Sequence, residues 1–347
     1  MNYYNPSKIL SMTDLDGEIP SIYIITSNRS AGKTTAFLKK SLELFQEKGK
    51  KTILLYRFSY ELVACADIYK DVLFLYNEYG KEMTAKSRAN GLFYEMFLDG
   101  ESFGFALSLN NPDTIKKYSP LFADVDLVIF DEYQTESGKY LKNEIQKMES
   151  ILISVMRGGG SQSRYVQVIL LGNNVTLMNP YFIKFGIYNR LRFDTKFMRG
   201  KGWVAEFHFN ESASTAIKEN PFAKAFENDS YIDYSSQNCY LVDSECFIDK
   251  PKGKNKYLFT ISHEGELYGV RDFYEDGYIY ISRKSDMTCK TVVTFKANNH
   301  TQNTIMLNHY SYIWQNIRDA YNGGFLRFDN IKTKSAIFDI LAIDLYN

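Results

Sequence analysis

The sequence TSNRSAGKTT, residues 26–35, joins an apolar run to a segment with helical periodicity. It matches the phosphate-binding pattern G-x-x-x-x-G-K-[ST], except that Ser27 occupies the position of the first glycine. The run SIYIIT before it (residues 21–26) predicts a buried parallel strand, and Phe37, Leu38, Leu42 and Phe45 after it recur at helical spacing. A strand, a loop with a glycine and a helix, in this order, predict a phosphate site, because free N–H groups at a helix start favour anions.

Three further apolar runs predict strands of the same sheet: residues 52–56, 127–130 and 166–171. They alternate with helical stretches, which indicates βαβ units, a parallel sheet and a ligand at the carboxyl ends of the strands. The fold class predicted for this part of the chain is therefore α/β.

The loop and the start of its helix supply the predicted nucleotide contacts: Ser27, Asn28, Arg29, Ser30, Ala31, Gly32, Lys33 and Thr34. In such loops the lysine bridges the β- and γ-phosphates and the hydroxyl that follows binds Mg²⁺. We therefore predict ATP and Mg²⁺ as ligands. Arg29 is either a contact to the γ-phosphate or a solvated loop charge.

Polar residues follow two of the other strands. Asp131 ends the run LVIFDE (residues 127–132) in the position of a second magnesium ligand, and Glu132 after it is a candidate general base for hydrolysis. Asn173 follows the next strand and is the candidate sensor of the γ-phosphate. The alternatives are a strand that ends in a charged turn and a simple Asx turn.

An arginine finger is the remaining part that such sites often need. Arg157 follows a helical stretch and precedes Gly158-Gly159-Gly160, which favours presentation across an interface, and Arg164 is a second candidate. A cation stabilised by the carboxyl end of a helix is the alternative for Arg157.

The charge composition excludes a protein with an overall basic field, since Lys+Arg and Asp+Glu both number 41. Two local basic stretches, residues 184–202 and 250–256, are either contacts to nucleic acid or docking surfaces, or else solvated segments. Lys116 and Lys117 are further candidates for contact with DNA.

The compartment is predicted from three absences in the sequence. Four scattered cysteines form no CxxC pair, the first residues do not form a signal peptide, and no apolar run approaches the length of a membrane span. We therefore expect an intracellular protein that is not secreted and has no membrane partner.

The second half of the chain predicts helices at residues 213–225 and then an antiparallel meander at residues 257–262, 266–270 and 278–282. A two-metal nuclease needs converging carboxylates, and the first strand of the meander ends in Ser262 and His263 instead of an aspartate. Asp272, Asp329 and Asp339 are the remaining acids, and nothing in the sequence brings them together. We therefore do not expect nuclease activity.

Five segments carry a resemblance that spans nearly the whole chain: YNPSKIL (residues 4–10), AGKT (31–34), VIFDE (128–132), LGNNVTLMNPYF (171–182) and NGGFLRFDN (322–330). Together they resemble the genome-packaging ATPases of phi29-like tailed phages, a terminase-like motor family. Lys33, Asp131, Glu132 and Arg157 fall on that family's loop lysine, metal aspartate, catalytic glutamate and trans-acting finger.

The resemblance implies three domains. Residues 1–197 would form a P-loop ATPase of the additional-strand, catalytic-glutamate class, residues 198–228 a small helical linker, and residues 229–347 a degenerate RNase H-like α+β domain that binds DNA or the capsid vertex.

The resemblance also implies a DNA-stimulated ATPase that acts as a homo-oligomeric, pentameric ring in the host cytoplasm, docked transiently on the portal (connector) vertex of the prohead. It would pump double-stranded DNA into the preformed capsid. Some relatives use a packaging RNA, which leaves that partner open. The alternatives are another P-loop DNA-dependent ATPase, such as a helicase, and a non-hydrolysing structural protein of the vertex.

Overall fold

The computed structural model describes residues 4–78, 80–137, 139–157, 162–188, 190–191, 195–225, 246, 248, 251–308 and 311–346. The chain divides into two compact units. The first unit comprises Met1–Val175 and Leu191–Cys239, and the second comprises Thr176–Arg190 and Tyr240–Asn347.

The first unit contains a nine-stranded sheet in the order β3-β4-β5-β2-β6-β7-β1-β9-β8. Its strands are β1 (Ile22–Ser27), β2 (Lys51–Tyr56), β3 (Met83–Arg88), β4 (Phe93–Leu98), β5 (Glu101–Ser108), β6 (Val125–Phe130), β7 (Gln167–Asn173), β8 (Phe197–Gly200) and β9 (Trp203–His208). From β5 to β9 all neighbours are parallel, whereas β3, β4 and β8 pair antiparallel. Strand β7 lies between β1 and β6. The four predicted strands are confirmed as β1, β2, β6 and β7.

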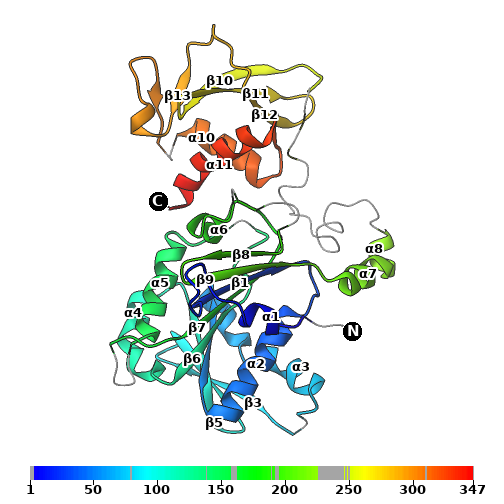
Figure 1. Ribbon diagram of the computed structural model, residues 1–347, viewed down its shortest axis with the longest axis vertical. Helices are drawn as coiled ribbons and strands as arrows, with labels where there is room; N and C mark the ends of the chain where they lie inside the picture. Colours follow the sequence, from blue (N-terminus) through cyan, green and yellow to red (C-terminus); the bar gives the residue numbers. More distant parts are fainter. Residues whose placement is uncertain are drawn as a thin grey trace. The chain divides into compact units, whose positions relative to one another are not determined.

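Helices cover both faces of this sheet, with α2 and α3 on one side and α4 and α5 on the other (Figure 1). The helical segments of the first unit are α1 (Ser7–Leu10), α2 (Lys33–Lys48), η1 (Ser59–Ala64), α3 (Asp67–Leu75), α4 (Pro112–Ile115), η2 (Lys116–Phe122), α5 (Glu144–Val155), α7 (Glu211–Glu219) and α8 (Pro221–Ala225). Helix α2 buries Phe37, Leu38 and Leu42, the apolar positions that predicted it, and ends at Gly49, whose φ is 65°.

The first sheet continues past residue 197, the predicted end of the ATPase domain. Strand β9 pairs in parallel with β1 along its whole length, from Ile22 opposite Trp203 to Ser27 opposite His208. Pairing between strands about 180 residues apart is decided by the tertiary fold, which is why local patterns missed it. Of the predicted linker, residues 198–228, the helical part corresponds to α7 and α8.

The second unit contains a six-stranded sheet in the order β14-β13-β10-β11-β12-β15. Its elements are α6 (Pro180–Lys184), β10 (Lys256–His263), β11 (Glu266–Phe273), β12 (Tyr278–Ser282), β13 (Val292–Thr294), η3 (Ala297–Asn299), β14 (Ile305–Met306), α10 (Tyr312–Asn322), β15 (Leu326–Phe328) and α11 (Ile331–Tyr346). The antiparallel meander β10-β11-β12 is confirmed, and the short parallel strands β13, β14 and β15 were not predicted. Helices α10 and α11 pack on one face of this sheet (Figure 1).

One segment of the second unit, Thr176–Arg190, follows shortly after β7 of the first unit in the chain. Residues 176–190 include α6, and their Met178 and Ile183 belong to the hydrophobic core of the second unit. Thr176 shares a hydrogen bond with the Tyr321 hydroxyl, and the Tyr188 hydroxyl donates to Asp339 Oδ1 at 2.5 Å. The NPYF motif noted in the sequence is thus a structural part of the second unit.

No helix among the described residues is both long enough and apolar enough to span a membrane.

Gly104 provides a test of the β2–β5 pairing. A Cβ atom at this position would lie 1.9 Å from the backbone oxygen of Thr52 on the neighbouring strand. We expect Gly104→Ala to destabilise the protein by about 3 kcal/mol or more, because a backbone atom cannot move aside without breaking the ladder. Urea denaturation measures this, with the exposed Ser87→Ala on β3 as the control; equal midpoints for both variants would contradict the pairing.

Candidate functional site

Five of the predicted site residues meet at the carboxyl edge of the first sheet, from the ends of β1, β6 and β7 and the start of α2. The ammonium group of Lys33 donates to Ser27 Oγ at 2.7 Å and to Asn173 Oδ1 at 3.1 Å. The Thr34 hydroxyl donates to Asp131 Oδ2 at 2.7 Å. The lysine, the hydroxyl, the aspartate and the asparagine, which lie up to 140 residues apart in the chain, therefore form one polar cluster.

The unusual residue of the loop, Ser27, is the last residue of β1 and has no positive φ. The first position of this loop therefore does not require glycine, and the serine hydroxyl also accepts a hydrogen bond from Lys33. Gly32 has a φ of 85° immediately before α2, a conformation that glycine adopts without strain. Ser30 has a φ of 58°, so the loop turns twice through the left-handed region.

The cluster contains opposite charges in a poorly solvated place. Desolvation lowers the pKa of the Lys33 ammonium to about 8; the charge of Asp131 opposes this shift and that of Arg29 adds to it. Desolvation also raises the pKa of Asp131, while the Thr34 hydrogen bond and the Lys33 charge lower it. Both charges would be better compensated by a ligand that carries anionic oxygens and a divalent cation. Hydroxyl and carboxylate oxygens are the donors that Mg²⁺ prefers.

Glu132 lies at a strained position of the backbone, with a φ of 56°. Its N–H donates to Asp131 Oδ1 at 2.9 Å, and its side chain is exposed. Partial desolvation, followed by the charges of Asp131 and Glu136, raises its pKa. A carboxylate with a raised pKa is a better proton acceptor at neutral pH than an ordinary one.

The three candidate arginines have different surroundings. Arg29 forms an ion pair with Glu136, with Nη2 3.4 Å from Oε1, and both side chains are partly exposed. Arg157 is exposed just beyond the end of α5. Arg164 donates to the carbonyl oxygens of Phe122, Val125 and Val155 in its own chain, which favours Arg157 over Arg164 as a group presented to another subunit.

The sequence did not predict two contacts that hold the phosphate-binding loop, one from Asn210 and one from Tyr4. Asn28, which is 1% exposed, donates to the carbonyl of Asn210 at 3.1 Å and accepts from the Asn210 N–H at 3.0 Å. Asn210 in turn caps α7 through the Ala213 N–H. The N-terminal segment also contacts the loop, because the Tyr4 N–H donates to the carbonyl of Ala31 at 2.9 Å. The YNPSKIL motif was the available signal for this last contact.

A second set of missed contacts joins the turn after β6 to β1 and to the chain that follows β7. The Tyr133 hydroxyl shares a hydrogen bond of 2.6 Å with Thr26 and accepts one of 3.1 Å from Gln134. Gln134 Oε1 accepts from the Val175 N–H at 3.3 Å. Val175 is the last residue of the first unit before the chain enters the second.

The basic stretch at residues 184–202 does not form one surface within either unit. Lys184 and Arg190 belong to the second unit, and Lys196, Arg199 and Lys201 belong to the first. Arg192 lies outside the described residues. In the stretch at residues 250–256, Lys254 forms an ion pair of 3.1 Å with Glu275, and Lys250 lies outside the described residues.

The acids of the second unit lie on different elements: Asp272 on β11, Asp329 after β15 and Asp339 on α11. Within the described residues there is no group of three or more His, Cys, Asp or Glu side chains suited to a metal ion. Asp339 accepts the Tyr188 hydroxyl hydrogen bond and so holds α11 to the segment at residues 176–190.

The family model of the podovirus DNA encapsidation protein (Gp16) matches residues 1–343. The chain belongs to this family. The resemblance to the packaging proteins of phi29-like phages is thereby confirmed. The DNA packaging protein of Bacillus phage phi29 is 24% identical over 342 residues, which cover 97% of this chain and 96% of that protein. That of Bacillus phage B103 is 25% identical over 306 residues, which cover 87% and 90%.

Two solved structures have the same fold as this member of the Gp16 family. A chain of the bacteriophage phi29 viral genome packaging motor assembly is 22% identical, with 99% of each chain covered and a TM-score of 0.55. A chain of the phi-28 gp11 DNA packaging motor is 14% identical, with 99% of this chain and 98% of that chain covered and a TM-score of 0.56. The α/β architecture described above is therefore that of phage packaging motors.

The hydrogen bonds between Asn28 and Asn210 should contribute measurably to the stability of the protein. We expect Asn28→Ala to lower the free energy of unfolding by about 3 kcal/mol, because it leaves a buried N–H and a buried carbonyl of Asn210 without these partners. Thermal and urea unfolding of the full chain measure the loss. Asn303→Ala, at an exposed asparagine of the second unit, is the control, and a loss no larger than the control's would show that the anchor is not formed.

Proposed function

We propose that the chain is the ATP-driven motor subunit that moves double-stranded viral DNA into a preformed capsid. The convergence of Lys33, Thr34, Asp131 and Asn173 in a member of the DNA encapsidation family carries this proposal. The similar phage proteins are named DNA packaging proteins, which supports the proposal independently of the geometry of the site.

In the proposed mechanism, the residues from Ser27 to Thr34 form the ATP-binding loop, and Lys33 binds the β- and γ-phosphate oxygens. Thr34 and Asp131 are the residues that would hold Mg²⁺, which would neutralise phosphate charge. Glu132 accepts the proton of the attacking water, consistent with its raised pKa. Asn173, already within hydrogen-bonding distance of Lys33, senses the γ-phosphate.

The proposed domain organisation follows the same assignment. Residues 1–208 would hold the P-loop ATPase sheet of the additional-strand, catalytic-glutamate class, and α7 and α8 would form the linker. The position of β7 between β1 and β6 supports that class. The antiparallel meander extended by parallel strands supports an RNase H-like second unit, for which we propose a DNA- or vertex-binding role without nuclease activity.

The partners we propose are double-stranded DNA, the portal vertex of the prohead and further copies of this chain in a pentameric ring, all in the host cytoplasm. In this ring Arg157 of one subunit would complete the ATP site of its neighbour, and its exposure beyond α5 is compatible with that role. Arg29 would give up its ion pair with Glu136 and contact the γ-phosphate instead. Loss of the γ-phosphate would reach the second unit through Asn173 and the chain that follows it.

Two other functions make different predictions. A helicase of the same loop class would be stimulated more by single strands than by duplex DNA. A structural protein of the vertex that does not hydrolyse ATP would show no detectable ATP binding.

The loop assignment predicts that Lys33→Ala lowers the DNA-stimulated ATPase rate by a factor of roughly 100 or more, because the charge that faces the phosphates is removed. The measurement is phosphate release by the full chain with and without duplex DNA. Lys39→Ala is the matched control, because Lys39 lies on the same helix, pairs with Glu43 at the surface and lies over the ring of Tyr76. A Lys33→Ala rate equal to that of the control would refute the assignment.

The ring mechanism predicts complementation between two inactive proteins. Arg157→Ala keeps its own Glu132, and Glu132→Gln keeps its finger, so a mixed ring contains sites with both groups intact. We expect each variant alone to be inactive and the mixture to recover part of the duplex-stimulated rate. No recovery at any mixing ratio would argue against a finger at Arg157.

A further inference from the structure

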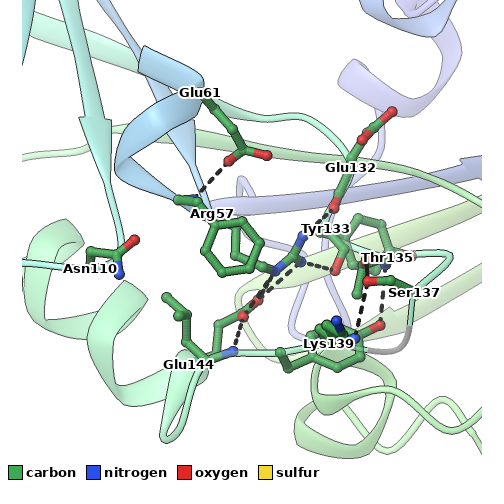
Figure 2. Close-up of polar contacts among 12 residues, drawn as sticks. Arg57, Glu61, Asn110, Glu132, Tyr133, Thr135, Ser137, Lys139 and Glu144 are labelled. Carbon is green, nitrogen blue, oxygen red and sulfur yellow. Dashed lines mark hydrogen bonds and ion pairs between the residues drawn. The ribbon is translucent and has the colours of Figure 1, made fainter. Parts of the chain in front are cut away.

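Arg57 follows β2 and lies buried beside the acidic turn that ends β6, its neighbour in the sheet. Its Nη1 donates to the carbonyl of Glu132 at 3.1 Å, and its Nη2 donates to the carbonyl of Tyr133 at 2.7 Å. Figure 2 shows that the Glu132 side chain extends away from this guanidinium, whereas the Glu132 carbonyl faces it. Arg57 therefore binds the backbone of the predicted catalytic residue, while the carboxylate of that residue points away from the guanidinium.

The other side of the guanidinium is held equally firmly. Arg57 Nε lies 3.0 Å from Glu144 Oε2, and Nη2 lies 3.1 Å from Glu144 Oε1. Glu144 is 3% exposed and also accepts from the Leu141 N–H at 2.8 Å. The rings of Phe130 and Tyr140 lie 5.4 and 5.2 Å from the guanidinium carbon. All three nitrogens of Arg57 are thus engaged in a fixed plane.

The turn at Glu132 needs such restraint. A residue other than glycine in the left-handed region costs roughly 1–2 kcal/mol, and surrounding contacts must compensate for this strain. The carbonyl groups of Glu132 and Tyr133 are bound by Arg57, and the Tyr133 N–H donates to the carbonyl of Leu171 at 3.1 Å. Arg57 accordingly supplies two of the bonds that fix the direction in which the Glu132 side chain leaves the backbone.

We propose that Arg57 is a positioning residue for ATP hydrolysis, which orients the Glu132 carboxylate by binding the backbone carbonyl groups of Glu132 and Tyr133. This inference rests on the proposed role of Glu132 as general base. A lysine cannot replace the clamp, because a single ammonium group lacks the planar fork that reaches two carbonyls and a carboxylate at once.

The clamp affects the chemical step more than nucleotide binding. The loop that would bind the phosphates has its own anchors, Asn28 to Asn210 and Tyr4 to Ala31. A small displacement of a catalytic group lowers the rate of the chemical step steeply, by about 100-fold for ~1 Å. The expected signature of a loosened Glu132 is therefore a lower kcat with unchanged affinity for ATP.

Arg164→Lys is a matched control for Arg57→Lys. Arg164 also binds three backbone carbonyls and an aspartate through its guanidinium, at Phe122, Val125, Val155 and Asp126, and none of these flanks Glu132. Both variants lose a guanidinium clamp, so both should lose stability. Only Arg57→Lys should lose catalysis.

The experiment measures DNA-stimulated kcat, the Kd of a fluorescent ATP analogue and thermal stability for the full-length chain. We expect Arg57→Lys to lower kcat on the order of 10- to 100-fold and to change the Kd by less than about 3-fold. Arg164→Lys should keep kcat within about 3-fold of wild type. Equal kcat values for the two variants, or a loss of ATP affinity that parallels the loss of kcat, would overturn the inference.

A second variant covers the case in which Arg57→Lys does not fold. The double change Arg57→Met with Glu144→Leu removes both buried charges together, and apolar replacement of a whole buried ion pair is often neutral for stability. We expect this variant to fold, to bind the ATP analogue and to show the same fall in kcat. A kcat at the wild-type level would overturn the inference.

Glu132→Gln separates this inference from the function on which it rests. If Glu132→Gln abolishes hydrolysis while the Arg57 variants keep it, only the role of Arg57 is overturned. If Glu132→Gln hydrolyses ATP at the wild-type rate, both the general base and its positioning residue are overturned.

Discussion

The burial of the Lys33 ammonium at the edge of a parallel sheet is the constraint around which the site is organised. Its charge is held by two neutral oxygens, on Ser27 and Asn173, and by the nearby carboxylate of Asp131. Neutral oxygens compensate a buried charge only in part, and the lowered pKa of Lys33 reflects this. The site thus has an electrostatic demand that a polyphosphate would meet, and the strands that end there must deliver their polar residues to the same point.

The groups around that point are fixed by separate anchors. The loop is tied to the start of α7 by Asn28 and Asn210, and to the N-terminal segment by Tyr4. The acidic turn is bound by Arg57, which follows β2 and forms an ion pair with Glu144 at the start of α5. Preorganised groups of this kind need no rearrangement when charge develops in a reaction. The same independence allows binding and hydrolysis to respond differently to substitution.

The path of the chain after Asn173 connects the site with the second unit. Gln134 contacts the Val175 N–H, and from Thr176 onward the chain belongs to the second unit, whose core includes Met178 and Ile183. LGNNVTLMNPYF forms one continuous motif in the sequence, and only its Asn173 has a predicted role. The structure divides the motif between the units, because Met178 packs in a core with residues from Cys246 onward.

The sequence by itself determined the local units: the strand, loop and helix around Lys33, the strands that end at Asp131 and Asn173, and the meander of the second unit. These follow from periodicity and from residue types at the ends of strands, which are properties of short segments. Only the tertiary structure decided that β9 pairs with β1, that Asn28 meets Asn210, and that Arg57 clamps the turn at Glu132. These contacts join residues 75 to 182 positions apart, and no local pattern specifies which distant backbone groups a buried side chain will satisfy.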